Sequence, residues 1–347
     1  MGKVKVLVID DSSLIRQLLT EIISSADDLV VVATAEDPID AREKIKQFNP
    51  DVLTLDIEMP KMDGITFLKN LMRLRPMPVV MISSLTKAGA PATLDALDIG
   101  AVDYIAKPKG GAWGDIQGYA QLIQSKVRSA AKANMAAYDR VVSSTIPTIV
   151  HANTAKYKSN KVICIGSSTG GTEALSKVLQ PMPDNCPPIL IVQHIPAVFS
   201  ASLAARLNSK CEITVREAKS GMPLEAGNAY LAPGDFHLKL FEKRDRLVTA
   251  LFDGDKMNGH KPSVDVLFHS VAEHVGCNAV AAILTGMGND GAAGLKEIFN
   301  LGGKTMVQDE ISSVVWGMPG SAVKLGAVQE ILPIKNITAS LLKACEI

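Results

Sequence analysis

Short runs of aliphatic and β-branched residues alternate with helix-type patterns along most of this chain, and few folds accommodate such an alternation. The connections are short, so each strand and the helix after it form one unit of a parallel sheet with helices on both faces. Between about 139 and 160 the alternation gives way to a stretch rich in Ser, Thr, Asn and Lys. We therefore expect two α/β domains joined by a linker.

The part before the linker contains five strand–helix units. They predict a five-stranded parallel sheet in the flavodoxin-like order 2-1-3-4-5. The expected strands are 4–9, 29–34, 51–56, 78–82 and 102–105. The expected helices are 13–25, 38–48, 63–75, 89–98 and roughly 115–138.

The part after the linker predicts a second doubly wound, mostly parallel sheet. Alternating apolar and polar residues around the charged segment EKRDR also predict a β-hairpin at 236–252. The expected strands are 162–166, 189–193, 212–215, 228–232, 279–284 and 303–307, with helices at 171–179, 199–208, 263–275, 291–300 and 336–345. We expect the first domain at 1–125, a helix end and linker at 126–158, and the second domain at 159–347.

Composition excludes several classes of function. Lys+Arg and Asp+Glu number 36 each, so no net field attracts the protein to nucleic acid or to an anionic membrane. No apolar stretch approaches the roughly 20 residues that span a bilayer, and the first residues indicate a strand and not a signal peptide. Five scattered cysteines without a CxxC pair favour reduced thiols over a zinc site or disulfides. We expect a cytoplasmic protein.

Acidic side chains and a lysine follow strands of the first sheet. Asp10 and Asp11 follow the first strand, Asp56 the third and Lys107 the fifth. The carboxyl ends of parallel strands meet at one edge, so these groups are expected in one crevice. The carboxylates repel one another there unless a cation and the lysine offset their charge, and oxygen ligands suit Mg²⁺. For the acidic pair and Ser12, capping of the next helix is the alternative role.

This pattern resembles the receiver domain of two-component response regulators, over residues 1 to about 125. The resemblance implies that Asp56 accepts a phosphoryl group from a histidine kinase. It also implies that Mg²⁺ is held by Asp10, Asp11, Asp56 and the backbone carbonyl of Glu58. The chain is therefore expected to be switched by phosphorylation.

Three further positions match the receiver pattern and carry the expected switch. By resemblance, Lys107 pairs with the phosphoryl oxygens, Ser83 moves its hydroxyl onto the phosphate, and Tyr104 follows inward. A new group of about −2 charge can bias such a two-state surface. In that family the peptide bond before the proline equivalent to Pro108 is cis, which the sequence leaves open here.

The second domain carries a G-x-S-x-G pattern where a strand is expected to turn into a helix. The segment GSSTGG at 166–171 would hold Ser168 at the carboxyl edge of the sheet, near the positive end of a helix dipole. A glycine-rich loop of this kind can instead bind a phosphate or a nucleotide. No lysine follows it as in a P-loop, and no acidic residue stands in the dinucleotide position, so a nucleophile is favoured.

A base and a carboxylate are available at the same sheet edge. His194 directly follows a buried-looking strand, with His260 and His269 as the next candidates. Asp290 lies in a glycine-rich loop between a strand and a helix, where the alternative is simple helix capping. Together, Ser168, His194 and Asp290 can act as nucleophile, general base and orienting carboxylate.

The segments IGSSTGGTEAL, VQHIPAVFS and LTGMGNDGAAG resemble those of the CheB family of chemotaxis receptor methylesterases, as does APGDFHL at 232–238. The chain order Ser, His, Asp also differs from the α/β-hydrolase order. The resemblance implies a protein-glutamate methylesterase that hydrolyses glutamyl methyl esters on chemoreceptors and deamidates receptor glutamines. The N–H groups of Thr169 and Met287 would stabilise the oxyanion, and the esterase reaction would need no cofactor.

The resemblance also implies partners. These are a chemotaxis histidine kinase as phosphodonor and the methylated cytoplasmic domains of chemoreceptors as substrate. We expect a monomer that binds no nucleic acid, is not embedded in the membrane and is recruited to receptor arrays. The unphosphorylated receiver is expected to limit access to the catalytic cleft. The alternative is a non-catalytic adaptor whose binding to receptors depends on phosphorylation.

Overall fold

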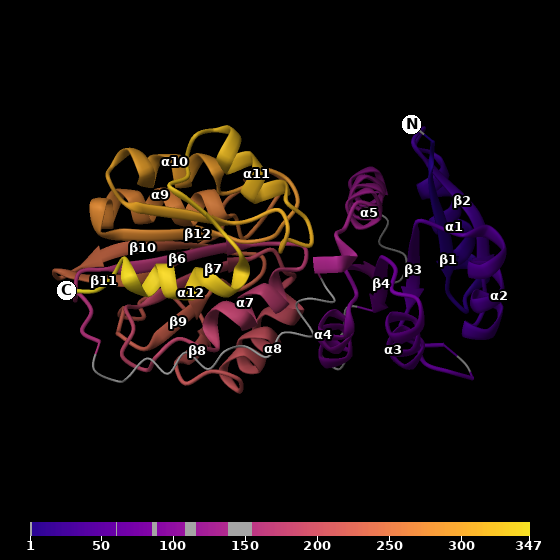
Figure 1. The fold of residues 1–347 in the computed structure, drawn as a ribbon, viewed down its shortest axis with the longest axis horizontal. Helices are drawn as coiled ribbons and strands as arrows, with labels where there is room; N and C mark the ends of the chain where they lie inside the picture. The colour runs from indigo at the N-terminus through magenta and orange to yellow at the C-terminus, as the bar shows by residue number, and fades with distance from the viewer. Residues whose placement is uncertain (1, 60, 85–88, 108–115, 138–154) are drawn as a thin grey trace. The chain divides into compact units, whose positions relative to one another are not determined.

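The chain forms two compact units, Met1–Met135 and Ala136–Ile347, in a computed structural model (Figure 1). The structure describes residues 2–59, 61–84, 89–107, 116–137 and 155–347. Pro108 and most of the expected linker lie outside the described residues. Within the described ranges, no helix combines the length and the apolar character needed to cross a membrane.

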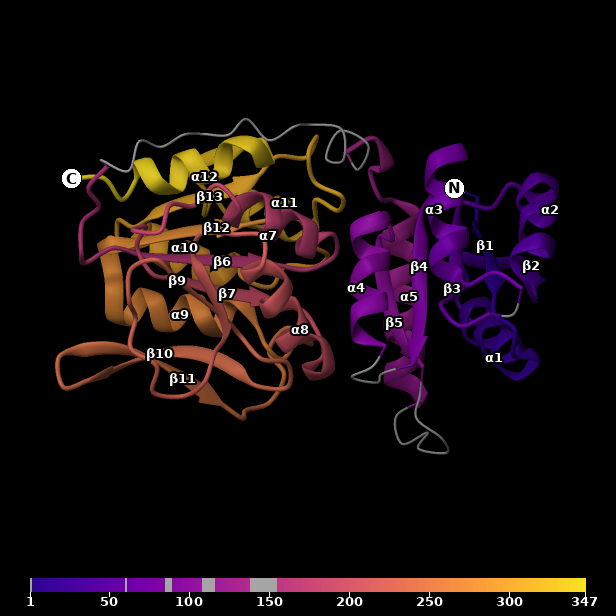
Figure 2. The same ribbon diagram turned by 90° about the horizontal axis from the view of Figure 1, so that it is seen from below.

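The first unit is a parallel sheet in the order β2-β1-β3-β4-β5, as expected. Helices cover both faces, and α1 packs beside α5 while α3 packs beside α4 (Figure 2). The strands are β1 (Val4–Ile9), β2 (Leu29–Ala35), β3 (Val52–Asp56), β4 (Val79–Ser84) and β5 (Asp103–Lys107). The helices are α1 (Ser13–Ser24), α2 (Pro38–Phe48), α3 (Gly64–Leu74), α4 (Ala90–Ile99) and α5 (Ile116–Ala131).

Three of these helices have a side-chain cap at their N-terminus. Ser12, Asp37 and Asp63 each accept a backbone N–H at the start of α1, α2 and α3. Ser12 therefore takes the capping role that was considered for it. At the start of α3 the backbone of Gly64 approaches Asp56 so closely that an added Cβ would lie 2.0 Å from the Asp56 carbonyl oxygen. This position requires glycine because no side chain fits there.

The second unit contains a seven-stranded parallel sheet in the order β14-β13-β12-β6-β7-β9-β8, and β10 and β11 form a separate antiparallel hairpin. The sheet strands are β6 (Val162–Ser167), β7 (Ile189–Gln193), β8 (Thr214–Glu217), β9 (Asn228–Leu231), β12 (Ala279–Ile283), β13 (Lys304–Gln308) and β14 (Glu330–Leu332). The hairpin strands are β10 (His237–Lys243) and β11 (Arg246–Phe252). The helices are α7 (Gly171–Leu179), α8 (Ala197–Asn208), α9 (Val264–Val275), α10 (Ala292–Asn300), α11 (Gly317–Lys324) and α12 (Ile334–Lys343). A short 3₁₀ turn, η1 (Gly276–Asn278), follows α9.

Besides the short η1 turn, one helix and one strand of this unit were not expected from the sequence. Helix α11 contains Pro319 and two glycines, residues that disfavour a helix, and it forms because it packs against α10 and β13. Strand β14 is too short to show a periodic pattern in the sequence. It joins the edge of the sheet because Ile331 pairs with Val307 of β13. Strand β8 begins two residues later than the expected 212–215.

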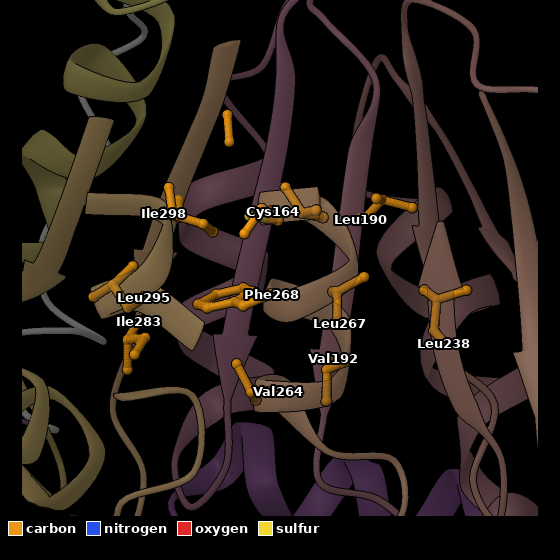
Figure 3. Close-up of a cluster of buried hydrophobic side chains, with 14 of the residues drawn as sticks. Cys164, Leu190, Val192, Leu238, Val264, Leu267, Phe268, Ile283, Leu295 and Ile298 are labelled. Carbon is orange, nitrogen blue, oxygen red and sulfur yellow. The ribbon is translucent and has the colours of Figure 1, made fainter. Parts of the chain in front are cut away.

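Helix α9 is anchored in the core of the second unit. Its residues Leu267 and Phe268 are fully buried and face Cys164 of β6 and Ile283 of β12 (Figure 3). Helix α10 closes the cluster with Leu295. Burying a side chain such as Phe268 contributes about 2–3 kcal/mol. This packing fixes the position of the N-terminus of α9, which contacts the site described below.

The five cysteines are all unpaired. Cys164, Cys186 and Cys345 are buried, Cys211 is partly buried and Cys277 is exposed. Burial raises the pKa of the Cys186 thiol to about 12 and that of the Cys211 thiol to about 11. These thiols are therefore protonated and unreactive at neutral pH, because the thiolate is the reactive form.

Candidate active site and acidic crevice

An acidic cluster lies at the carboxyl edge of the first sheet. One carboxylate oxygen from each of Asp10, Asp11 and Asp56 lies within 4.8 Å of the others. The Nζ atom of Lys107 is 3.0 Å from Asp10 Oδ2 and 2.8 Å from Asp56 Oδ2. Burial raises the pKa of Asp56 to about 6, with Lys107 opposing the rise and the charge of Asp10 adding to it. Three carboxylates with one lysine leave excess negative charge, and their hard oxygens fit a divalent cation such as Mg²⁺.

The cluster opens into a hollow of about 670 Å³, which Glu58 and Ser83 also line. The Ser83 hydroxyl is 2.9 Å from the Thr93 hydroxyl. Tyr104 is buried, with 7% of its surface exposed. The structure therefore places Ser83 in the same hollow as Asp56, and it places the Tyr104 side chain in the protein interior.

The second site lies at the carboxyl edge of the second sheet, where Ser168, His194 and Asp290 follow the neighbouring strands β6, β7 and β12. His194 Nε2 is 2.8 Å from Asp290 Oδ2. The backbone N–H of His194 donates to the Ser167 carbonyl oxygen at 3.1 Å. The backbone N–H of Ser168 donates to the Thr285 carbonyl oxygen, also at 3.1 Å. Backbone hydrogen bonds thus join the three loops that carry the predicted residues.

The imidazole of His194 pairs with the carboxylate through Nε2, which leaves Nδ1 on its other side. Nδ1 is buried and has no hydrogen-bond partner among the described residues. A buried polar atom without a partner is unfavourable, and such atoms often have a role in function. The described contacts include no hydrogen bond from the half-buried Ser168 hydroxyl to this ring. In ligand-free hydrolases that contact often forms only when substrate binds.

Asp290 is held by the N-terminus of α9. Its carboxylate accepts hydrogen bonds from the Ser263 hydroxyl at 2.7 Å, the Val264 N–H at 2.7 Å and Asn258 Nδ2 at 3.0 Å. Burial favours the neutral acid, but hydrogen bonding and charge from His194, followed by Asn258 and Ser263, hold the pKa of Asp290 well below its ordinary value. Asp290 does not cap its own helix α10, whose first turn has no side-chain cap.

Gln193 and Thr285 connect the loops and were not predicted as site residues. Gln193 Nε2 donates to the Ser168 carbonyl oxygen at 2.9 Å, and its Oε1 accepts from the Ser167 hydroxyl at 2.7 Å. The Thr285 hydroxyl donates to the Thr169 carbonyl oxygen at 3.0 Å. Gln193 is the last residue of one predicted strand and Thr285 directly follows another, and this position is the sequence signal that could have found them.

The loop that contains Met287 is fixed on both sides. The Gly286 N–H donates to the Val315 carbonyl oxygen at 2.9 Å, and the Met318 N–H donates to the Gly286 carbonyl oxygen at 2.8 Å. An added Cβ at Gly286 would lie 2.8 Å from Ser168 Cβ, so this loop and the serine are in close contact. The backbones of Thr169 and Met287 therefore belong to two fixed loops next to the serine.

The segment at 232–238 supports the site indirectly. His237 is buried, its Nδ1 accepts from the Ser263 N–H at 3.2 Å, and its Nε2 is 2.9 Å from the Asp255 carbonyl oxygen. Since Ser263 caps α9 and donates to Asp290, His237 is one contact removed from the carboxylate.

The two units together define a class of protein, a receiver-type domain joined to an α/β domain of hydrolase type. The family model described as CheB methylesterase matches residues 163–341, and the model for the response regulator receiver domain matches residues 6–112. The chain belongs to the CheB methylesterase family.

Curated relatives match nearly the whole chain. A relative from Salmonella typhimurium, named protein-glutamate methylesterase/protein-glutamine glutaminase, is 50% identical over 342 residues, covering 99% of this chain and 97% of that protein. A relative from Xanthomonas campestris, named protein-glutamate methylesterase/protein-glutamine glutaminase 1, is 52% identical over 345 residues, covering 98% and 96%. The crystal structure of the Thermotoga maritima CheB methylesterase catalytic domain is 40% identical and covers 53% of this chain and 97% of that one, with a TM-score of 0.52.

Proposed function

We propose that this protein is a protein-glutamate methylesterase that hydrolyses glutamyl γ-methyl esters on the cytoplasmic domains of chemoreceptors. We extend to it the protein-glutamine glutaminase activity for which its relatives are named. The observation that carries the proposal is the His194 ring, which Asp290 holds at Nε2 while Nδ1 is buried without a described partner. That ring lies at the same sheet edge as Ser168.

In the first half-reaction the Ser168 hydroxyl oxygen attacks the ester carbonyl carbon, and Nδ1 of His194 takes the hydroxyl proton. Asp290 stabilises the imidazolium that forms. The N–H groups of Thr169 and Met287 stabilise the oxyanion, and each such donor contributes about 3–4 kcal/mol in comparable sites. The tetrahedral intermediate then collapses, the carbon–methoxy bond breaks, and the imidazolium returns its proton so that methanol leaves.

In the second half-reaction His194 removes a proton from water, and the resulting hydroxide attacks the acyl group on Ser168. The receptor glutamate leaves as a carboxylate and the serine is restored. A glutamine side chain can follow the same route, with ammonia leaving in place of methanol. Either substrate yields one additional negative charge on the receptor.

In the first unit, Asp56 is proposed to accept a phosphoryl group from a histidine kinase. Asp10, Asp11, Asp56 and the carbonyl of Glu58 would hold Mg²⁺, which offsets negative charge at the transferred group. Lys107 already lies beside two of these carboxylates and would pair with a phosphoryl oxygen. The excess negative charge in the crevice supports this assignment.

Phosphorylation is proposed to switch esterase activity through Ser83 and Tyr104. The Ser83 hydroxyl would exchange its contact with Thr93 for one with the phosphate.

The proposed domain limits are 1–125 for the receiver, 126–158 for the helix end and linker, and 159–347 for the catalytic domain. We also propose a cytoplasmic monomer that is recruited to receptor arrays.

Release of methanol from methylated receptor membranes tests the proposed activity. Wild type should release methanol, Ser168→Ala should lose nearly all turnover, and Ser209→Ala, a change at the exposed end of α8, should behave as wild type. A non-catalytic adaptor would show no difference between wild type and Ser168→Ala. Equal rates in these two proteins would therefore refute the esterase assignment.

A further inference from the structure

A second imidazole lies flat against the ring of His194. The ring centroids of His194 and His260 are 3.7 Å apart, and the ring planes differ by 9°. His194 follows β7, whereas His260 lies in the connection between β11 and α9. Two segments that are distant in sequence therefore bring these rings together.

A tight turn sets the position of His260. Met257 and His260 exchange two backbone hydrogen bonds, of 3.1 and 2.9 Å. Between them, Asn258 and Gly259 both have positive φ angles, of 54° and 80°. This is the geometry of a two-residue type I′ turn, which favours the pair Asn-Gly. The backbone at His260 is thus fixed locally.

The same turn also contacts the carboxylate of the site. Asn258 Nδ2 lies 3.0 Å from Asp290 Oδ1 and 2.7 Å from Asp265 Oδ2. Asn258 therefore reaches the carboxylate that holds His194, while His260 covers the face of the His194 ring. One four-residue turn contacts two of the three proposed catalytic side chains.

We propose that His260 is a positioning residue that acts through His194. It holds the ring in place, and its aromatic face stabilises the imidazolium that forms when His194 takes the serine proton. A cation within about 6 Å of an aromatic face is attracted by the ring quadrupole. Because the imidazolium forms during the reaction, this contact is stronger in the transition state than in the ground state and acts on kcat more than on KM. The inference rests on the proposed function.

The charged and titratable groups described around His194 come from two elements besides its own. Asp290 contacts Nε2 from the loop after β12, and His260 covers the ring from the turn before α9. Asp265 lies one contact further away, because its Oδ2 accepts from Asn258 Nδ2 at 2.7 Å and its backbone N–H donates to Asp290 Oδ1 at 3.3 Å. Replacing His260 removes both an aromatic face and a titratable group, so two replacements are needed to separate these effects.

His260→Phe keeps an aromatic face without a titratable group, and His260→Leu removes both. We expect His260→Leu to lower kcat about ten-fold with KM unchanged, and His260→Phe to remain within about three-fold of wild type. The acid limb of kcat/KM should lie at lower pH in His260→Leu than in His260→Phe, because His194 is harder to protonate without the aromatic face. His269→Leu, at a partly exposed histidine of α9 that pairs with Glu297, is the control and should match wild type.

Titration of the His194 ring by NMR in the same folded variants gives a readout that does not depend on substrate. The pKa of His194 should be lower in His260→Leu than in His260→Phe. Equal His194 pKa values and equal kcat in these two variants would overturn the proposal, since packing alone would then explain the stack. If wild type and Ser168→Ala release methanol equally, the proposed function fails, and the titration still decides the role of His260.

Discussion

The Thr285 hydroxyl donates a hydrogen bond to the Thr169 carbonyl oxygen across 3.0 Å, and it thereby links the loop after β12 to the turn that contains Ser168. The carbonyl oxygen of Thr285 also accepts a hydrogen bond from the backbone N–H of Ser168 at 3.1 Å. One buried threonine, which is 1% exposed, therefore holds the backbone of the proposed nucleophile and that of the next residue, Thr169.

Thr285→Val should weaken this alignment while preserving side-chain shape. The buried Thr169 carbonyl oxygen loses a donor, so we expect the free energy of unfolding to fall by about 1–2 kcal/mol and kcat to fall about ten-fold. Thr305→Val is the control, because the Thr305 hydroxyl is buried on β13 without a hydrogen-bond partner among the described residues. Urea denaturation and methanol release test both variants, and equal losses in the two would contradict the role given to Thr285.

Asp290→Asn should lower kcat by about 10³–10⁴-fold, because the amide cannot stabilise the imidazolium. The variant should also change the pH dependence of stability. The pKa of Asp290 is depressed in the folded protein, so its stabilising contribution is present above the unfolded pKa and is lost as pH falls through the folded value. The difference in unfolding free energy between wild type and Asp290→Asn should therefore shrink below about pH 4. A difference that grows on acidification would contradict this assignment.

A small acyl phosphate with Mg²⁺ should raise the esterase rate of wild type, and Asp56→Asn should show no response. Removal of Mg²⁺ with EDTA should abolish the response, because Lys107 alone would then have to offset the charge of three carboxylates and a phosphoryl group. Incorporation of radiolabelled phosphate gives a direct second readout. A donor effect that persists in Asp56→Asn would place the phosphorylation elsewhere.

Gly171→Ala should destabilise the second unit although alanine favours helices by about 1 kcal/mol. An added Cβ would lie 2.2 Å from Gln193 Oε1, so the side chain that holds the Ser168 carbonyl must move. We expect a net loss of about 1–3 kcal/mol in unfolding free energy and a lower kcat. The double variant with Gln193→Ala should recover part of the Gly171→Ala loss in a double-mutant cycle. Simple additivity would show that the two sites are not coupled.

The strand ends of both sheets could be predicted because apolar runs stop at polar residues there. Asp56 ends β3, Lys107 ends β5 and His194 directly follows β7, each at the position where the parallel topology brings side chains to one edge. The alternation predicted a doubly wound parallel sheet, and the flavodoxin-like order assigned to the first sheet is confirmed. These features depend on local pattern and on the geometry of parallel sheets.

The supporting contacts could not be predicted in the same way. Asn258 lies in a loop far from Asp290 in sequence, and its contact depends on where α9 packs. The Asn258–Gly259 pair is a turn signal, but it does not reveal which group the turn approaches. The pairing of Asp290 with Nε2 of His194 likewise depends on the three-dimensional approach of two loops.

The exposed thiol of Cys277 lies just before β12, at the opposite end of that strand from the loop that carries Asp290. Three of the other four cysteines are buried, and burial raises the pKa of the fourth, Cys211, to about 11. A maleimide dye at neutral pH should therefore attach selectively to the native sequence, with no engineered cysteine. The dye would stand roughly 16 Å or more from the reaction centre, the length of a five-residue strand. Fluorescence could then follow receptor docking in real time while turnover continues.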